Sequence, residues 1–126
     1  MARRFCELVY DDFIFGTTAV FTADRFNELL GSANRLAIQV VADKATGTSP
    51  TFSLLVFHGA DGRNFASILG AGAEIPATAL NLTAVTLLNG AADYSSMLRY
   101  VRLRLTLGGT NPGAHVKVYA TGRDKA

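Results

Sequence analysis

The strongest constraint on the fold is a two-residue hydrophobic period that recurs along the chain. It is clearest over residues 100–107, where every second side chain is apolar. Successive side chains of a β-strand point to opposite faces, so this alternation predicts a strand with one buried face. The apolar set is Val101, Leu103, Leu105 and Leu107, and the opposite set is Tyr100, Arg102, Arg104 and Thr106. Further strands are predicted over 36–42, 51–58 and 114–121.

Turn-forming residues separate these segments. Residues 47–50 read Gly-Thr-Ser-Pro and residues 109–112 read Gly-Thr-Asn-Pro. Glycine and asparagine adopt positive φ at low cost, and proline cannot donate a bond within a sheet. The pattern predicts two long hairpins, which pair 36–42 with 51–58 and 99–107 with 114–121. The repeat is consistent either with hairpins that share turn chemistry or with a two-fold-like sandwich.

Helical signals are confined to one short segment. Over Asp24–Gly31, the apolar residues Phe26, Leu29 and Leu30 share one face, and Gly31 is a suitable stop. Many short strands with so little helix favour an all-β fold, an antiparallel β-sandwich of the jelly-roll or immunoglobulin-like type with at most one short helix. The length of 126 residues suits a single domain over 1–126.

Composition limits the classes of protein that remain. Hydrophobic residues make up 49% of the chain and charged residues only 17%. No apolar run reaches the roughly 18 residues of a membrane-spanning helix, and the first residues do not read as a signal peptide. We therefore expect the apolar surplus to serve a core or contact with other chains. A single cysteine, Cys6, excludes an internal disulfide and a zinc finger.

No arrangement of residues predicts catalysis. His58 precedes a turn and has no nucleophile motif nearby, and Cys6 lies in an apolar strand where we expect it to be buried. Asp11-Asp12 and Asp61-Gly62 lack the spaced oxygen ligands of a calcium loop. We expect no enzymatic activity, no catalytic residues, no metal site and no cofactor.

The final predicted hairpin carries the most informative surface. Basic residues outnumber acidic ones from Arg99 onward, whereas acidic residues predominate before it. If Leu107 and Ala114 close the hairpin, Arg104 faces Lys117 and Arg102 faces Tyr119. Like charges directly opposite each other destabilise a sheet unless another group compensates them. Protein contact, solvent and nucleic acid are alternatives, of which we favour protein. The predicted interface residues are Tyr100, Arg102, Arg104, Lys117 and Tyr119, together with Arg3, Arg4 and Phe5 of an N-terminal assembly arm at 1–10.

Two stretches resemble small structural proteins of tailed bacteriophages. One runs from Ala45-Thr46-Gly47-Thr48-Ser49-Pro50 to Asp61-Gly62-Arg63-Asn64-Phe65, and the other from Arg99-Tyr100-Val101-Arg102-Leu103 to Gly109-Thr110-Asn111-Pro112. The resemblance implies a β-sandwich virion component, above all a capsid decoration (cement) protein that binds and stabilises the shell. It implies assembly in the bacterial host cytoplasm and contact with further copies, preferably as a trimer, and with a major capsid protein. Membrane and nucleic-acid partners are not expected.

The same residues support an alternative. The segments Asp61–Phe65 and Arg99–Leu103 also resemble discoidin-type carbohydrate-binding modules, although the chain lacks tryptophan and a cysteine pair. A sugar-binding adhesion module of a virion is therefore the second hypothesis.

Overall fold

The structure is a computed structural model that describes residues 4–32, 35–67, 74–80, 85–88, 92–93 and 99–123. The long strands are β1 (Arg4–Phe15), β3 (Arg35–Gly59) and β8 (Tyr100–Arg123). The shorter strands are β2 (Val20–Phe21), β4 (Ala66–Ser67), β5 (Glu74–Ala79), β6 (Val85–Leu88) and β7 (Ala92–Asp93). A 3-10 turn (Asp24–Phe26) leads into helix α1 (Asn27–Gly31), as the sequence predicts. No helix in the described part of the chain has the length and apolar character needed to cross a membrane.

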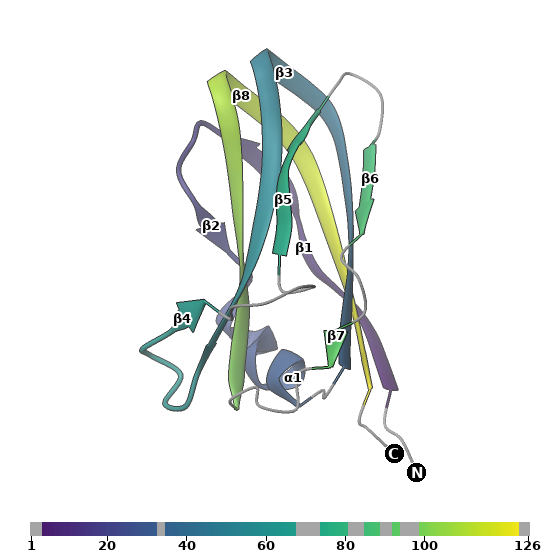
Figure 1. Cartoon of the computed structure of the whole chain (residues 1–126), viewed down its shortest axis with the longest axis vertical. Helices are drawn as coiled ribbons and strands as arrows, with labels where there is room; N and C mark the ends of the chain where they lie inside the picture. The colour runs from purple at the N-terminus through teal and green to yellow at the C-terminus, as the bar shows by residue number, and fades with distance from the viewer. Residues whose placement is uncertain are drawn as a thin grey trace.

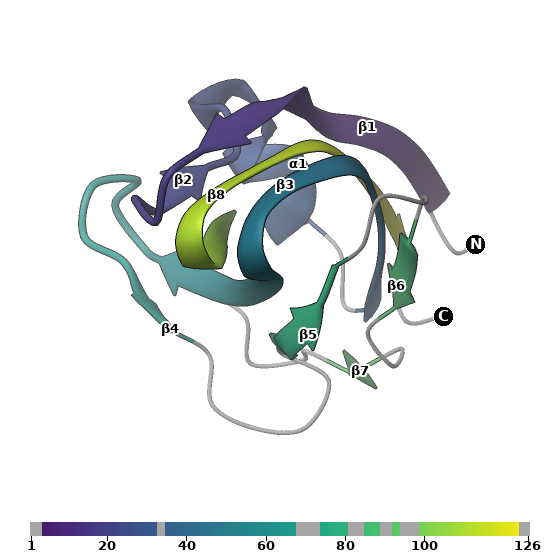
Figure 2. The ribbon, with the colours of Figure 1, turned by 90° about the horizontal axis from the view of Figure 1, so that it is seen from above.

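The fold is organised around one antiparallel pair of long strands that bends over itself. β3 and β8 pair from Arg35 opposite Arg123 to Gly59 opposite Tyr100. Midway along, both strands bend together, so each contributes to two layers (Figure 1). The first layer contains residues 51–59 of β3 and 100–108 of β8, and the second contains residues 35–46 of β3 and 113–123 of β8. Viewed from above, the two strands form nested curves (Figure 2).

The two predicted hairpins are therefore wrong, although the predicted sandwich is confirmed. Residues 36–42 pair with 116–122 and residues 52–58 pair with 101–107, so neither long strand pairs with itself. The register shifts three times between Asp43 and Thr51, where bulges bend the ribbon. Glycine, asparagine and proline specify local backbone angles, and the same residues suit a chain reversal and a bend. Pairing along the whole ribbon decides in favour of the bend.

The repeated turn sequence has a specific role at this bend. Gly47 (φ +97°) and Gly109 (φ +108°) stand against each other's strands. A Cβ on Gly47 would lie 2.5 Å from the carbonyl oxygen of Asn111, and one on Gly109 would lie 2.7 Å from that of Ser49. Only glycine permits this backbone approach at positive φ. The two similar segments thus make reciprocal contacts where the paired strands bend.

The flanking strands follow the same bend on both sides of the central ribbon. β1 pairs with the second-layer half of β8, and β2 pairs with the first-layer half. On the other side, β5 and β4 pair with the first-layer half of β3, whereas β6 and β7 pair with its second-layer half. This folded antiparallel ribbon is a jelly-roll-like sandwich.

The core lies between the two layers and matches the alternation in the sequence. Val101, Leu103 and Leu105 of β8 are fully buried from the first layer, and Val116 and Val118 are fully buried from the second. Burial of each such side chain contributes about 1.5–3 kcal/mol. Helix α1 lies at the end of the sandwich away from the bend, where it buries Leu30 completely (Figure 1).

Candidate functional site

The predicted interface residues of β8 are divided between the two layers. Arg102 and Arg104 lie in the first layer, opposite Phe57 and Leu55. Lys117 and Tyr119 lie in the second layer, on the other half of the bent strand. The expected juxtapositions of Arg104 with Lys117 and of Arg102 with Tyr119 are therefore wrong, because they depended on the hairpin.

The remaining predicted residues are also dispersed. Lys117 stands between Val41 of β3 and Asp11 of β1, and Tyr119 stands between Gln39 and Leu8. Tyr100 begins β8 opposite Gly59. In the N-terminal segment, Arg3 lies outside the described residues. The backbone of Arg4 and the half-buried Phe5 belong to β1, so the expected arm at 1–10 is, from residue 4 onward, an edge strand of the sandwich.

On the outer face of the first layer, two arginines are surrounded by phenylalanines. The guanidinium of Arg102 lies 4.0 Å from the ring centroid of Phe21 and 4.1 Å from that of Phe65. The guanidinium of Arg104 lies 5.0 Å from the ring centroid of Phe57. Phe21 and Phe57 meet edge to face at 6.1 Å. We call Phe21, Phe57, Phe65, Arg102 and Arg104 the arginine–phenylalanine cluster.

The positive charge of this cluster has no counterion among the described residues. The Nε atoms of Arg102 and Arg104 are buried and have no hydrogen-bond partner there. Arg99 provides a contrast, because its guanidinium is exposed and forms an ion pair with Glu28 at 2.8 Å. A buried donor without an acceptor costs free energy. The cluster is therefore an electropositive site whose charge is not compensated within the described part of the fold.

A short loop positions Phe65 over Arg102. The carboxylate of Asp61 accepts hydrogen bonds from the backbone N–H groups of Asn64 and Arg63, both at 2.9 Å. It also accepts one from the side-chain amide of Asn64 at 2.7 Å. These bonds, led by the Asn64 backbone N–H, lower the pKa of Asp61 to about 2. Gly59 allows the loop to close, because a Cβ there would collide with the Asn64 carbonyl oxygen.

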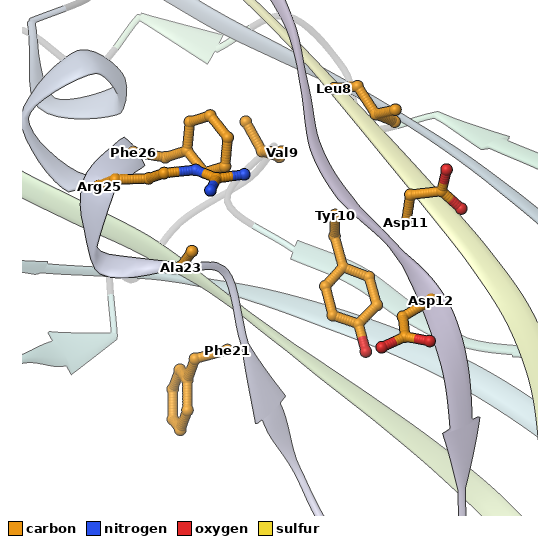
Figure 3. Close-up of a pocket in the computed structure, with 9 residues that line it drawn as sticks. All are labelled: Leu8, Val9, Tyr10, Asp11, Asp12, Phe21, Ala23, Arg25 and Phe26. Carbon is orange, nitrogen blue, oxygen red and sulfur yellow. The ribbon is translucent and has the colours of Figure 1, made fainter.

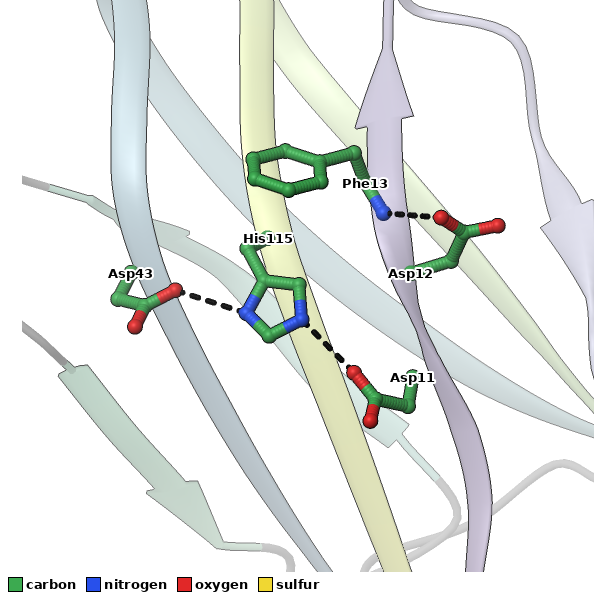
Figure 4. Close-up of polar contacts among 5 residues, drawn as sticks. All are labelled: Asp11, Asp12, Phe13, Asp43 and His115. Atoms are coloured by element: carbon green, nitrogen blue, oxygen red, sulfur yellow. Dashed lines mark hydrogen bonds and ion pairs between the residues drawn. The ribbon is translucent and has the colours of Figure 1, made fainter.

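A histidine links three strands on the outer face of the second layer (Figure 4). His115 contacts Asp11 of β1 through Nε2 at 2.7 Å and Asp43 of β3 through Nδ1 at 3.0 Å. The Phe13 ring lies 5.1 Å from the imidazole. An imidazolium donates from both nitrogens, whereas a neutral imidazole donates from only one. The described residues hold no group of three or more side chains suited to a metal ion. The contacts of His115 with Asp11 and Asp43 join β8 to β1 and β3.

The end of β1 nearest the bend exposes two stacked aromatic rings. Phe13 is 44% exposed and Phe15 is 73% exposed. Their rings are nearly parallel, with centroids 5.8 Å apart and an angle of 7° between planes. The ammonium of Lys44 lies 5.8 Å from the Phe13 ring. Such a pair exposed on an edge strand is typical of a surface that contacts another protein.

A groove of about 350 Å³ separates the edge strands of the two layers (Figure 3). Tyr10 and Asp12 line it from β1, and Phe21, Arg25 and Phe26 line it from β2 and the 3-10 turn. Burial raises the pKa of Tyr10, and the charge of Asp12 adds to this rise. The groove combines apolar walls with a hydroxyl, a carboxylate and a guanidinium, which is a usual composition for a ligand site.

Sequence reasoning missed the aromatic members of these sites. Phe57 stands at an outward position of a strand whose inward residues are Phe52, Leu54 and Val56. Phe13 and Phe15 likewise point away from the core. A large apolar residue on the polar face of an alternating strand was the available signal. The expectation that Cys6 is buried is wrong, because it is exposed and its Sγ accepts a hydrogen bond from Thr121 at 3.5 Å.

No family model and no curated protein matches the chain. Solved structures match in fold. A structure of infectious bursal disease virus, Gx strain, gives a TM-score of 0.59 at 10% identity over 98% of this chain and 33% of that chain. The structure of a T13 particle of the same virus gives a TM-score of 0.61 at 10% identity, over 95% of this chain and 30% of that chain. The C-terminal family 22 carbohydrate-binding module of Clostridium thermocellum Xyn10B gives a TM-score of 0.57 at 12% identity, over 96% of this chain and 80% of that chain.

These likenesses establish the fold. The chain spans about a third of the length of the viral chains that it matches and most of the length of the carbohydrate-binding module. It is an antiparallel β-sandwich that resembles domains of viral capsid proteins and carbohydrate-binding modules.

Proposed function

We propose that the chain is a non-enzymatic structural protein of a bacteriophage virion, a capsid decoration protein that binds the assembled shell and stabilises it. The phage-like turn segments support the phage origin, and the fold shared with viral capsid domains supports a structural role. The proposed partners are the major capsid protein and further copies of the chain, with a trimer as the preferred form. The protein would assemble in the host cytoplasm and reside in the virion.

The exposed aromatic pair on β1 carries this proposal. Among the described residues β1 pairs with β8 alone, so no described strand covers its other edge. The stacked rings of Phe13 and Phe15 lie at one end of this edge strand. An edge strand with exposed aromatic side chains provides both backbone groups for strand addition and apolar anchors for a partner. Buried aromatic anchors commonly supply most of the binding energy at an interface.

Co-sedimentation with capsid shells tests the proposal. The purified chain should sediment with shells assembled from the major capsid protein encoded in the same genome. Phe15→Ser should weaken this binding on the order of tenfold or more, because it removes an aromatic anchor. Thr17→Ala, an exposed change just beyond β1, is the matched control and should bind like the wild type. A wild-type chain that stays in the supernatant would refute the proposal.

Carbohydrate binding is the second candidate, and the groove between the layers favours it. The groove presents the Tyr10 hydroxyl next to the Asp12 carboxylate, and the Phe26 ring lies beside Arg25 on another part of its wall (Figure 3). The fold also covers 80% of the length of a carbohydrate-binding module. Titration calorimetry with soluble oligosaccharides tests this candidate. Saturable heat that Tyr10→Ala abolishes would support it, and the absence of heat from any sugar would count against it.

A further inference from the structure

We infer that Arg102 and Arg104 form a preorganised binding site for carboxylate groups, and that its ligand is an acidic segment of another virion protein. The assignment of the ligand to a virion protein rests on the proposed function, whereas the carboxylate chemistry rests on the cluster itself. The site lies on the first layer and is separate from the aromatic pair of β1, which flanks the second layer.

The cluster holds both guanidinium groups in place before any ligand arrives. The Arg102 guanidinium carbon lies over two rings, at 4.0 Å from the Phe21 centroid and 4.1 Å from the Phe65 centroid, so two aromatic contacts hold the group in place. Arg104 lies over Phe57, and Phe57 meets Phe21 edge to face. A guanidinium that is already oriented loses less freedom on binding, so the stacking favours affinity.

The spacing of the two arginines suits an extended acidic segment. They are two residues apart on β8 and share the outer face, which places their backbone positions roughly 7 Å apart. Carboxylates two residues apart on an extended partner have the same spacing. Each guanidinium can then bind one carboxylate with a charge-assisted hydrogen bond.

The uncompensated charge provides the driving force. Both Nε donors are buried without a partner among the described residues, so part of the cost of removing the guanidinium groups from water is incurred in the fold itself. An arriving carboxylate supplies the missing opposite charge. Arg99, which already has Glu28 at 2.8 Å, has no such need.

A second copy of the chain is poorly equipped to supply the carboxylates. Most of the exposed acidic side chains that the structure describes already accept hydrogen bonds within the chain. They are Asp11, which contacts His115, Asp12, which accepts from the Phe13 N–H, Asp61, which accepts within its loop, and Glu28, which pairs with Arg99; the half-buried Asp43 also contacts His115. The exposed acidic side chains that remain in the described part, Glu7 of β1 and Asp24 of the 3-10 turn, do not stand two residues apart on one strand, so we assign the carboxylates to another protein.

Nucleic acid fits this face less well. The described outward positions that neighbour the two arginines are Ser53, Leu55 and Phe57 on β3 and Tyr100 and Thr106 on β8. None carries a positive charge, whereas a phosphate backbone is bound by a row of cations.

Side-chain NMR tests the inference on the intact chain. The probe is an acetylated, amidated peptide of six glutamates, and the readout is the Nε–Hε signals of the arginines. The Arg102 and Arg104 signals should shift saturably, and that of Arg99 should not. Combined Arg102→Lys and Arg104→Lys substitutions retain the charge but remove the planar fork, and they should weaken peptide binding about tenfold. The matched control, Arg99→Lys, should bind as the wild type does.

The outcomes separate the inference from the proposed function. Absence of shifts, equal shifts at Arg99, or tighter binding of single-stranded DNA than of the peptide would each overturn the carboxylate site. Shifts that follow protein concentration without peptide would instead identify a second copy as the ligand and overturn the inference. If the lysine variant no longer binds the peptide but still sediments with shells, the assignment of the ligand to a virion protein is wrong. If the wild-type chain does not bind the peptide but does sediment with shells, the carboxylate site is refuted and the proposed function is retained. Should the double variant fail to fold, Arg104→Lys replaces it.

Discussion

The stacking of Phe65 on Arg102 makes a measurable contribution to stability, and a double-mutant cycle isolates it. The changes are Phe65→Leu, Arg102→Met and their combination. The guanidinium lies 4.1 Å from the Phe65 ring centroid, well within the range of a cation–π interaction. Exposed examples contribute about 0.5–1 kcal/mol and desolvated ones about 2 kcal/mol. Because both side chains are half-buried, we expect a coupling free energy of about 1 kcal/mol.

Urea denaturation of the four proteins measures this coupling. A coupling of about 1 kcal/mol corresponds to a shift of roughly 4 °C in Tm for a domain of this size, so thermal unfolding provides a second readout. The control cycle pairs Phe65→Leu with Lys117→Met, because Lys117 lies in the other layer. Its changes should add within about 0.3–0.5 kcal/mol. A coupling no larger in the Arg102 cycle than in this control would refute the stacking and with it the preorganised site.

Three further predictions test the fold. The folded state lowers the pKa of Asp61 from its usual 3.8 to about 2. The ionised Asp61 therefore stabilises the fold fully above about pH 3.8, and this stabilisation is lost as the pH falls from about 3.8 to about 2. Asp61→Asn should therefore flatten the pH dependence of urea unfolding in this acid range, and an unchanged profile would contradict the loop geometry. In a Cys6→Ser background, Ser53→Cys and Thr106→Cys should form a disulfide detectable by peptide mapping, because these positions face each other across β3 and β8; the hairpin arrangement would leave both thiols free. Leu103→Ala, at a fully buried position, should cost about 2–5 kcal/mol in free energy of unfolding, and a loss below 1 kcal/mol would show that the core is placed wrongly.

Local patterns determined a large part of this protein. Alternation alone identified the buried face of β8, because a strand presents successive side chains to opposite sides whatever its neighbours are. The helical segment was predictable for a similar reason, since the spacing of Phe26 and Leu30 and the stop at Gly31 are properties of one short stretch. The all-β class followed from the number of such strands and the scarcity of helix.

Only the tertiary structure decided which strands pair and which side chains meet. Gly47 and Gly109 specify local angles, and those angles serve a hairpin as well as a bend. The choice rests on register along the whole β3–β8 ribbon, which depends on packing between residues far apart in the chain. The candidate sites inherit this dependence. Arg102 meets Phe21 and Phe65 because three segments converge on one outer face, a juxtaposition that no local period encodes.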